Sequence, residues 1–369
     1  MSEQRPVFVY VGSYTTERTP PDRFVPAQSA AKGIRVFRVD PVTLEWQLIQ
    51  EAEQLNPMYL LFGKGQKTLY AASSDSSSVY AYRIDSNTGL LSPLNNQQIA
   101  GRSTLCLSAT RDFTHLIVGA ISGAIASISL CEDGSLGSVC DNFNLPGERG
   151  PLRDEQPCPR PHHCPFDLLG EHCYVLDKGG DAVDIYNVDC QTGKMELHAR
   201  LLTRPGSIPR HIAFHPNGRF AYINTEHIGT VISCRIEQPG GDLTPFQILP
   251  TIPEDYVGNY SLSSEIAVHP SGKWLYVSNR GHNSIAVFSI DPFSGTLKIL
   301  GWQSTLGEIP RYFSIEPGGR FLYAANQKSG TIQVFSIDLK TGLLSFSGQT
   351  VKTPTPVWML FSGPIPSHF

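Results

Sequence analysis

The sequence predicts an all-β fold, a seven-bladed β-propeller whose ring is closed by a C-terminal strand that joins the N-terminal blade. Three observations predict this architecture. A short strand pattern recurs seven times, at spacings of 47 to 60 residues. A second apolar run and usually a tight turn follow each recurrence. The strand expected before the first recurrence is missing, and one is left over after the last. We therefore expect residues 1–369 to form a single domain.

The recurring strand combines β-branched and aromatic residues and is bounded by Gly, Pro, Asn or Asp, as in "HPNGRFAYINTE" (residues 215–226). Such a pattern is typical of short antiparallel strands joined by tight turns. A small sheet cannot bury both of its faces alone, so the units must stack around an axis. The strands centre on Tyr10, Tyr70, Ile117, Tyr174, Tyr222, Tyr276 and Tyr323.

The innermost strand of each unit is expected just before the recurring one, as in "IPRHIAFHPNG" before Tyr222. The first segment of this kind begins at residue 56, after Tyr10 has passed. The last, residues 354–364, has no recurring strand behind it. We therefore expect this last segment to pair with the N-terminal blade, which would leave no open edge in the ring.

Composition excludes several classes of partner. The formal charge of −4 argues against nucleic acid, and no apolar run is long enough for a transmembrane span. The eight cysteines form no CxxC pair, and we find no export signal, so we expect reduced thiols and a cytoplasmic protein. Cys164, beside two histidines, is expected to be a packed thiol rather than a nucleophile.

Two polar, Pro-rich segments exceed the repeat, residues 16–32 and residues 141–162. Both are interpreted as loops, and long loops in compact domains are often functional.

Polar residues that differ between units mark one end of the expected channel. In an antiparallel pair, the beginning of the first strand and the end of the second lie at the same end of the sheet. Because the innermost strands surround the axis, the polar side chains at these strand ends should converge on one mouth of the central channel. The expected neighbours are Arg210 with Glu226, Glu265 with Arg280, Arg311 with Gln327, and His163 with Asp177.

The chemistry expected at this mouth is a carboxylate among guanidinium groups. Arg210, Arg280 and Arg311 could bind a phosphate or carboxylate through paired hydrogen bonds. Glu226 could activate a water, and His163 could relay a proton near neutral pH.

Some of these residues could have a purely structural role instead. Glu265 and Arg280 could form only a structural ion pair. His211 is ambiguous and is kept as a substrate-binding candidate, while His162 could merely flank the functional histidine. A further pair of histidines belongs to HPxG turns, where turn capping is the expected role. These are His215 and His269.

The segments "PRHIAFHPNGRFAYINTE", "SSEIAVHPSGKWLYVSNRGHNSIAVF" and "PRYFSIEPGGRFLYAANQKS" resemble the seven-bladed lactonase family, which contains bacterial 6-phosphogluconolactonase and fungal 3-carboxy-cis,cis-muconate cyclase. The resemblance covers nearly the whole chain. It implies catalytic groups at His163, Arg210, Glu226 and Arg280, and further site positions at Glu265, Arg311 and Gln327. The family writes "PHxHS" where this chain has "RPHHCPF", so one histidine is absent and Cys164 replaces a serine.

This resemblance implies hydrolysis of a lactone by metal-independent water attack, with 6-phosphogluconolactone as the expected substrate and no cofactor. The expected partner is thus a small anionic substrate, with neither nucleic acid nor a membrane. The alternatives are a cyclase that forms a lactone from a carboxylated muconate at the same site, a non-catalytic propeller that docks other proteins, and a calcium-dependent lactonase. Arginines at the mouth disfavour the calcium-dependent reading.

Overall fold

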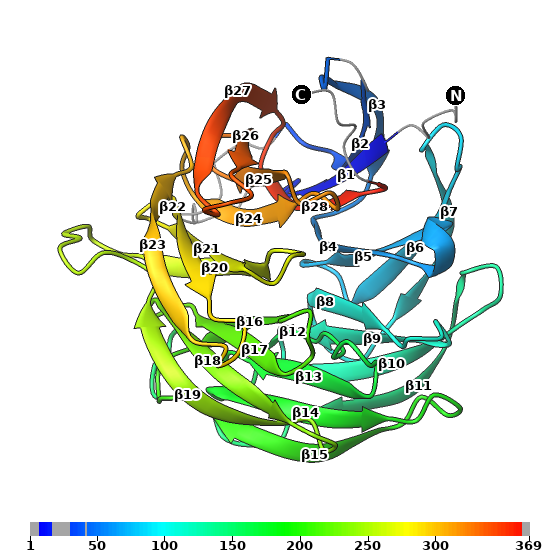
Figure 1. Cartoon of the computed structure of the whole chain (residues 1–369). Coiled ribbons are helices and arrows are strands. Elements are labelled where there is room, and N and C mark those ends of the chain that lie inside the picture. Colours follow the sequence, from blue (N-terminus) through cyan, green and yellow to red (C-terminus); the bar gives the residue numbers. More distant parts are fainter. Residues whose placement is uncertain (1–6, 17–29, 41–42, 364–369) are drawn as a thin grey trace.

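The propeller is present in the computed structural model, which describes residues 7–16, 30–40 and 43–363. Within these residues the strands form seven four-stranded antiparallel sheets around a central axis (Figure 1). The predicted fold class and the number of blades are confirmed. In the same ranges the only helical element is a 3-10 turn, η1 (Lys64–Gln66), and no helix is long and apolar enough to span a bilayer.

The first strand of each blade lies next to the axis, and Figure 1 shows these strands gathered around the centre. They coincide with the segments that the sequence assigns to the innermost position. Within the described residues they are β4 (Pro57–Phe62), β8 (Thr104–Ala109), β12 (Pro161–His163), β16 (Pro209–Phe214), β20 (Leu262–Val268), β24 (Pro310–Ile315) and β28 (Pro356–Phe361).

The second strands are almost completely buried and the third strands are mostly buried, because sheets on both sides cover them. The second strands are β1 (Val7–Ser13), β5 (Thr68–Ser73), β9 (His115–Ala120), β13 (His172–Asp177), β17 (Phe220–Thr225), β21 (Trp274–Arg280) and β25 (Phe321–Asn326). The third strands are β2 (Gly33–Val39), β6 (Ser78–Ile84), β10 (Ala124–Leu130), β14 (Ala182–Val188), β18 (Thr230–Glu237), β22 (Ser284–Ile290) and β26 (Thr331–Ile337).

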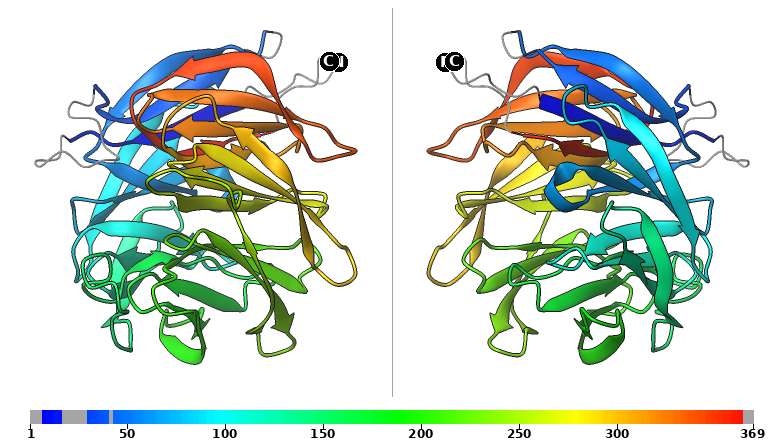
Figure 2. Two further views of the ribbon diagram at one scale, coloured as in Figure 1. Left: turned by 90° about the vertical axis from the view of Figure 1, so that its left-hand side faces the viewer. Right: turned by 90° about the vertical axis from the view of Figure 1, so that its right-hand side faces the viewer.

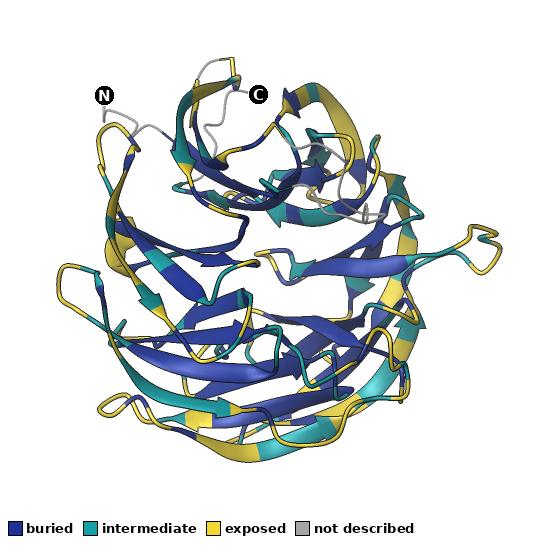
Figure 3. Ribbon diagram, turned by 180° about the vertical axis from the view of Figure 1, so that it is seen from behind, coloured by how far each residue is buried: buried dark blue, intermediate teal, exposed yellow. Residues whose placement is uncertain are grey.

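The fourth strands form the rim of the ring, and Figure 3 shows the exposed residues concentrated there. Polar residues are frequent along them, as expected for an outer strand with one face in solvent. They are β3 (Trp46–Glu53), β7 (Leu91–Gln98), β11 (Leu136–Asn144), β15 (Met195–Leu202), β19 (Asp242–Pro250), β23 (Leu297–Ser304) and β27 (Leu344–Lys352).

The ring closes as predicted, because β28 pairs with β1 and so completes the N-terminal blade. Val9 lies opposite Phe361, and Val11 lies opposite Met359. Ring closure gives the inner edge of β1 a partner strand, which removes an unpaired edge.

The blades pack face against face, as the side views show (Figure 2). The apolar core lies between neighbouring sheets: Tyr174 and Ile185 of one blade, for example, pack in one cluster with Ile212 and Ile223 of the next. Packing of this kind explains the repeated apolar runs, because each blade needs its neighbours to bury its faces.

A repeated hydrogen bond ties five blades of the described chain to the next blade, at the face opposite the mouth. The hydroxyl of Tyr222 donates to the carbonyl of Gly295, which lies in the turn of the following blade, at 2.9 Å. Gly295 has a φ of 72°, a backbone conformation that favours glycine. The same contact joins Tyr10 to Gly89, Tyr70 to Gly134, Tyr174 to Gly241 and Tyr276 to Gly342. The recurring tyrosine of the sequence therefore has a structural role.

The two HPxG histidines belong to this same face. Nδ1 of His215 accepts from the N–H of Asn217 within its own turn, and Nε2 contacts the Gly272 carbonyl of the next blade at 2.8 Å. His269 makes the equivalent contacts with Ser271 and with the Gly319 carbonyl. The prediction that these histidines cap turns is confirmed.

One loop is shorter than predicted. Residues 141–144 belong to β11, where Asp141 pairs with Ser127 and Asn144 pairs with Ala124, and residues 161–162 begin β12. The loop therefore covers residues 145–160, because the polar residues before it still pair along the rim of the sheet. Most of the other predicted loop, residues 17–29, lies outside the described residues.

Candidate active site

A β-bulge at the start of every described innermost strand builds one mouth of the channel. In β16, Pro209 pairs with Thr225 and His211 pairs with Asn224, so Arg210 is an extra residue without a partner on β17. A bulge re-aims side chains and is common beside active sites. Asn224 supports this one, because its Oδ1 accepts from the N–H of His211 at 2.9 Å. The extra residues are Met58, Leu105, His162, Arg210, Ser264, Arg311 and Val357.

The bulges line a cavity with an empty volume of about 310 Å³, part of which is open to solvent. Each lining residue is either the extra residue of a bulge or the residue that follows it. The lining consists of Met58, Tyr59, Leu105, His162, Arg210, His211, Arg311, Tyr312, Val357 and Trp358.

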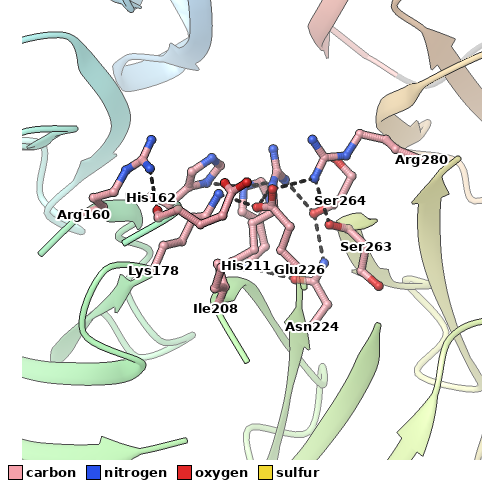
Figure 4. A network of polar contacts seen from close by, with 12 residues as sticks. Arg160, His162, Lys178, Ile208, His211, Asn224, Glu226, Ser263, Ser264 and Arg280 are labelled. Carbon is pink, nitrogen blue, oxygen red and sulfur yellow. Dashed lines mark hydrogen bonds and ion pairs between the residues drawn. The ribbon is translucent and has the colours of Figure 1, made fainter. Parts of the chain in front are cut away.

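The ends of the second strands bring charged groups to the same mouth, around Glu226 (Figure 4). Nζ of Lys178 contacts Oε2 of Glu226, while Nη2 of Arg280 lies 2.9 Å from Oε1 and Nε of Arg210 lies 3.4 Å from Oε2. The N–H of Glu226 donates to the carbonyl of Ile208, whose φ of 59° is strained for a β-branched residue. The carboxylate is thus held in place by its backbone and by its basic neighbours.

Electrostatics in this cluster oppose protonation of Glu226. Burial alone would raise its pKa, but the charges of Lys178, Arg280 and Arg210 outweigh burial and hold the pKa well below its usual range. Burial lowers the pKa of Lys178 to about 7, against the effect of the Glu226 carboxylate. Burial and the nearby Arg280 charge lower the pKa of Arg210 to about 9. Glu226 is therefore ionised at neutral pH and is a weak base.

A second polar group runs from the interior to the cavity. Nδ1 of His211 lies 2.9 Å from Oε1 of the buried Glu265, and Nε2 lies 3.2 Å from Nδ1 of His162. The His211 ring also stacks on His163, with 4.5 Å between ring centroids. Nδ1 of His163 in turn accepts from the N–H of Ile212 at 3.2 Å. His163 therefore packs beside the cavity lining, and His162 is part of it.

Aromatic residues form the opposite wall, on β4, β24 and β28. The Trp358 ring stacks on Tyr59 at 3.8 Å and lies 4.3 Å from Tyr312, measured between ring centroids. The mouth therefore has a charged side on β12, β16 and β20 and an aromatic side across from it.

Of the neighbours predicted from the sequence, Arg210 with Glu226 is confirmed by their ion pair. Arg311 and Gln327 also meet, because both backbone N–H groups donate to the Ile309 carbonyl. Arg311 lines the cavity with its guanidinium 5.6 Å from the Tyr14 ring centroid, while Gln327 is fully buried and is not part of the lining.

The other two neighbour predictions are wrong, and the bulges are the reason. The bulge at Ser264 and Glu265 places Glu265 opposite Ser278, so it reaches His211 while Arg280 reaches Glu226. The bulge at His162 places His163 opposite Leu176. Asp177 instead accepts from the backbone N–H groups of Arg160 and Gly179.

Sequence reasoning missed Lys178, although a signal was present. Lys178 is the fourth residue after its recurring tyrosine, as are Glu226, Arg280 and Gln327 after theirs. The prediction stopped one residue short, at Asp177.

The prediction that Cys164 is a packed thiol is confirmed. Cys164 is buried, and burial raises the pKa of its thiol well above the usual range.

Comparison with known proteins places this arrangement in context. Residues 8–361 match the family described as lactonase, 7-bladed beta-propeller. The sequence is 34% identical over 311 residues to 6-phosphogluconolactonase of Bacillus subtilis, covering 82% of this chain and 83% of the relative. It is 29% identical to 6-phosphogluconolactonase of Formosa agariphila, covering 83% and 86% of the two chains. The solved periplasmic gluconolactonase PpgL of Pseudomonas aeruginosa superposes with a TM-score of 0.88 at 27% identity, covering 98% of this chain and all of the other.

Proposed function

The chain belongs to the lactonase family of seven-bladed β-propellers, and from this premise we propose that it hydrolyses 6-phosphogluconolactone to the open phosphosugar acid without a metal ion. Its activity as a lactone hydrolase follows from the family and from the relatives named above. The phosphorylated substrate and the metal-independent chemistry are our proposal.

The excess of basic side chains at the mouth is the observation that supports a phosphorylated substrate. Lys178, Arg210 and Arg280 contact the one carboxylate of Glu226, and Arg311 lines the same cavity. A buried excess of positive charge is costly unless an anion neutralises it. A phosphate monoester carries nearly two negative charges at neutral pH and fits this requirement.

Two guanidinium groups have donors available for that anion. Arg210 lines the cavity, and its Nη2 has no hydrogen-bond partner among the described residues, whereas Nη1 donates to the Ser264 carbonyl. Arg311 forms no ion pair within the described part of the chain. We assign the substrate phosphate to these two arginines, because a guanidinium N–H forms a strong, charge-assisted hydrogen bond with a phosphate oxygen.

The aromatic wall supports binding of the sugar ring. Tyr59, Tyr312 and Trp358 provide an apolar surface opposite the charged side. Small-molecule sites combine such apolar walls with a few polar groups that fix orientation.

The role of Glu226 in this proposal differs from the one expected from the sequence. A carboxylate whose pKa is held well below its usual range by Lys178, Arg280 and Arg210 is poorly suited to take a proton from water. We propose that Glu226 keeps these basic groups together, and that Arg280 and Lys178 stabilise negative charge that develops on the reacting oxygen.

The same pairing supports chemistry without a metal. Glu226 is already neutralised by basic side chains, so it offers little attraction for a cation. Within the described ranges, no three His, Cys, Asp or Glu side chains are arranged to hold a metal ion. Activity that persists after dialysis against a chelator is the expected result, and restoration by added Ca²⁺ or Zn²⁺ would contradict it.

We also propose a reducing, cytoplasmic environment, because the cysteines of the described chain are free thiols and four of them are buried. Cell fractionation tests this location.

The deciding experiment compares 6-phosphogluconolactone with unphosphorylated gluconolactone. Loss of two hydrogen bonds between charged groups, each of at least about 1.5 kcal/mol, should lower kcat/KM on the order of 100-fold for the unphosphorylated lactone. Arg311→Leu should reduce this ratio, while Arg235→Leu on the exposed side of β18 should leave it unchanged.

Equal kcat/KM for the two lactones would overturn the phosphate assignment. A carboxylated muconate belongs in the same assay, because its cyclisation would use the same anion-binding groups. Turnover of the muconate without turnover of either lactone would overturn hydrolysis.

A further inference from the structure

The polar group formed by Glu265, His211 and His162 joins the interior to the cavity, and it suggests which residue activates water. Glu265 is buried on β20, His211 follows the bulge of β16, and His162 is the extra residue of the bulge on β12. Figure 4 shows His162 and His211 beside the Glu226 cluster. Three neighbouring blades thus each contribute one member.

The donors and acceptors around His211 fix where its proton lies. Oε1 of Glu265 accepts from the N–H of Ile266 at 2.9 Å, so it faces Nδ1 of His211 as an acceptor. Nδ1 of His211 must therefore donate, and its Nε2 must accept. Nη1 of Arg210, which can only donate, lies 3.1 Å from this Nε2 and agrees with that assignment.

The proton of His162 follows from that of His211. Nδ1 of His162 lies 3.2 Å from the accepting Nε2 of His211, so Nδ1 must carry a hydrogen, because two acceptors would repel each other. Nε2 of His162 is then unprotonated. No described residue donates to it, and His162 lines the cavity. The arrangement therefore presents one available imidazole lone pair at the mouth.

Burial and the charges nearby keep His162 neutral. Burial, followed by the Arg210 and Lys178 charges, holds the pKa of His162 well below its usual range. A substrate anion bound to the arginines would offset those charges and make the nitrogen more basic. Behind it, Oε2 of Glu265 is buried without a hydrogen-bond partner, and burial raises the pKa of this carboxyl to about 7. The Glu265 carboxyl also faces His163, Arg210, Tyr59 and Tyr312.

We propose that His162 is the catalytic base, and that His211 and Glu265 are positioning residues that fix its tautomer and orientation. The inference rests on the lactonase function proposed above. A carboxylate that orients an imidazole in this way is a recurring device in hydrolytic enzymes.

The reaction then balances without a further reactant. Nε2 of His162 takes one proton from water, and the oxygen of that water forms a bond to the lactone carbonyl carbon. The tetrahedral intermediate collapses, the ring C–O bond breaks, and the departing oxygen takes the proton back from Nε2. The product acid then releases its own proton to solvent.

Three other groups near the cavity are less well placed to act as the base. Nδ1 of His163 is occupied by the N–H of Ile212, and His163 does not line the cavity. Cys164 is fully buried with a raised pKa. Glu226 is already paired with basic side chains.

The test is a set of matched variants assayed on 6-phosphogluconolactone. His162→Gln should lower kcat about 10²- to 10⁴-fold with little change in KM, because general base catalysis contributes about that factor. The smaller variant His162→Gly should regain activity when imidazole is added, which a purely structural role would not produce. His198→Gln, on the outer strand β15, should leave kcat and KM unchanged.

The positioning residues should give a different signature. Glu265→Gln should lower kcat without changing KM and should shift the acidic limb of the pH–rate profile, while Glu265→Asp should recover part of the loss. Thermal unfolding of each variant identifies any that fail to fold, and the imidazole rescue then decides the role of His162.

The outcomes separate this inference from the proposed function. If the wild type is active and His162→Gln keeps kcat within about threefold, or if His163→Asn loses more activity than His162→Gln, the base assignment is overturned while the lactonase function stands. If the wild type turns over only unphosphorylated gluconolactone, the same variants are assayed on that lactone. If it turns over neither lactone, both proposals fail.

Discussion

The two faces of the ring differ in how far the repeat is preserved: one face has the same contact in most blades, and the other has a different residue in each blade. At the face opposite the mouth, five blades of the described chain place a tyrosine hydroxyl on a glycine carbonyl of the next blade. At the mouth, the residue four positions after the recurring one differs in every blade. These residues are Tyr14, Ser74, Ile121, Lys178, Glu226, Arg280 and Gln327.

This difference shows how a repetitive fold carries a single site. The repeated contacts join blades and are needed at each interface, so uniform residues suit them. The mouth forms a single binding site, so each blade can contribute a different side chain to one asymmetric pocket. We therefore expect substitutions at the mouth to affect function, and substitutions at the opposite face to affect stability alone.

Glu226→Gln tests the comparison most severely. It removes the counter-charge of buried basic groups, and breaking a buried ion pair from one side costs about 3–5 kcal/mol. Urea unfolding should show this loss, and inorganic phosphate should restore part of it by binding the basic groups that have lost their counter-charge. Glu308→Gln, which removes an exposed pair with Lys328, should cost less than about 1 kcal/mol. Equal losses in the two variants would contradict the idea that Glu226 organises the cluster.

Arg280→Leu should have the next largest effect, on activity. Loss of one electrostatic contact to the reacting groups should lower kcat/KM about 10²- to 10³-fold. The matched variant Arg219→Leu changes an exposed arginine at the opposite face, which donates to the Pro292 carbonyl. Steady-state kinetics should find that enzyme within about twofold of the wild type. A similar loss in both would show that the two faces do not differ in function.

The pH dependence of stability tests the buried carboxyl of the mouth. Burial raises the pKa of Glu265 from 4.5 to about 7, so between these values the folded protein binds a proton that the unfolded chain has released. Wild-type stability should therefore fall relative to Glu265→Gln as pH rises from 4.5 to 7, by about 1 kcal/mol per pH unit, and should level off above 7. Unfolding curves collected at several pH values measure this difference. Parallel curves would mean that Glu265 is already ionised at pH 5.

Tyr222→Phe should give the smallest effect, at the opposite face. It removes one buried hydrogen bond to Gly295, which is worth about 1 kcal/mol, while kcat/KM should stay unchanged. Tyr276→Phe, which breaks the equivalent bond to Gly342, should behave alike. A kinetic defect larger than the stability defect would mean that this face communicates with the site.

The fold could be predicted from the sequence because the strand pattern of one blade recurs seven times. Apolar alternation around each recurring residue, and the leftover segment 354–364, were enough to place the blades and the closing strand. The extent of the loop at residues 141–162 could not be read in the same way, because polar residues on an outer strand resemble those of a loop.

The site was predicted in part, and the limit was a shift of one residue. Arg210 and Glu226 were correctly placed together, but the bulges moved Glu265 away from Arg280 and His163 away from Asp177. A mark of these bulges is present in the sequence, because a proline stands directly before five of the extra residues in the described chain, as Pro209 does before Arg210. Which way each side chain turns after the bulge depends on packing between blades, which a single sequence does not record.

The pairing of β28 with β1 has a consequence for the time at which the enzyme becomes active. Val357 and Trp358, on β28, form part of the cavity wall, and the other blades precede them in the chain. A ribosome therefore makes every charged group of the mouth before it makes the strand that completes the pocket. Until β28 has left the exit tunnel, the nascent protein has the charged residues of the active site but lacks the complete cavity that binds the substrate.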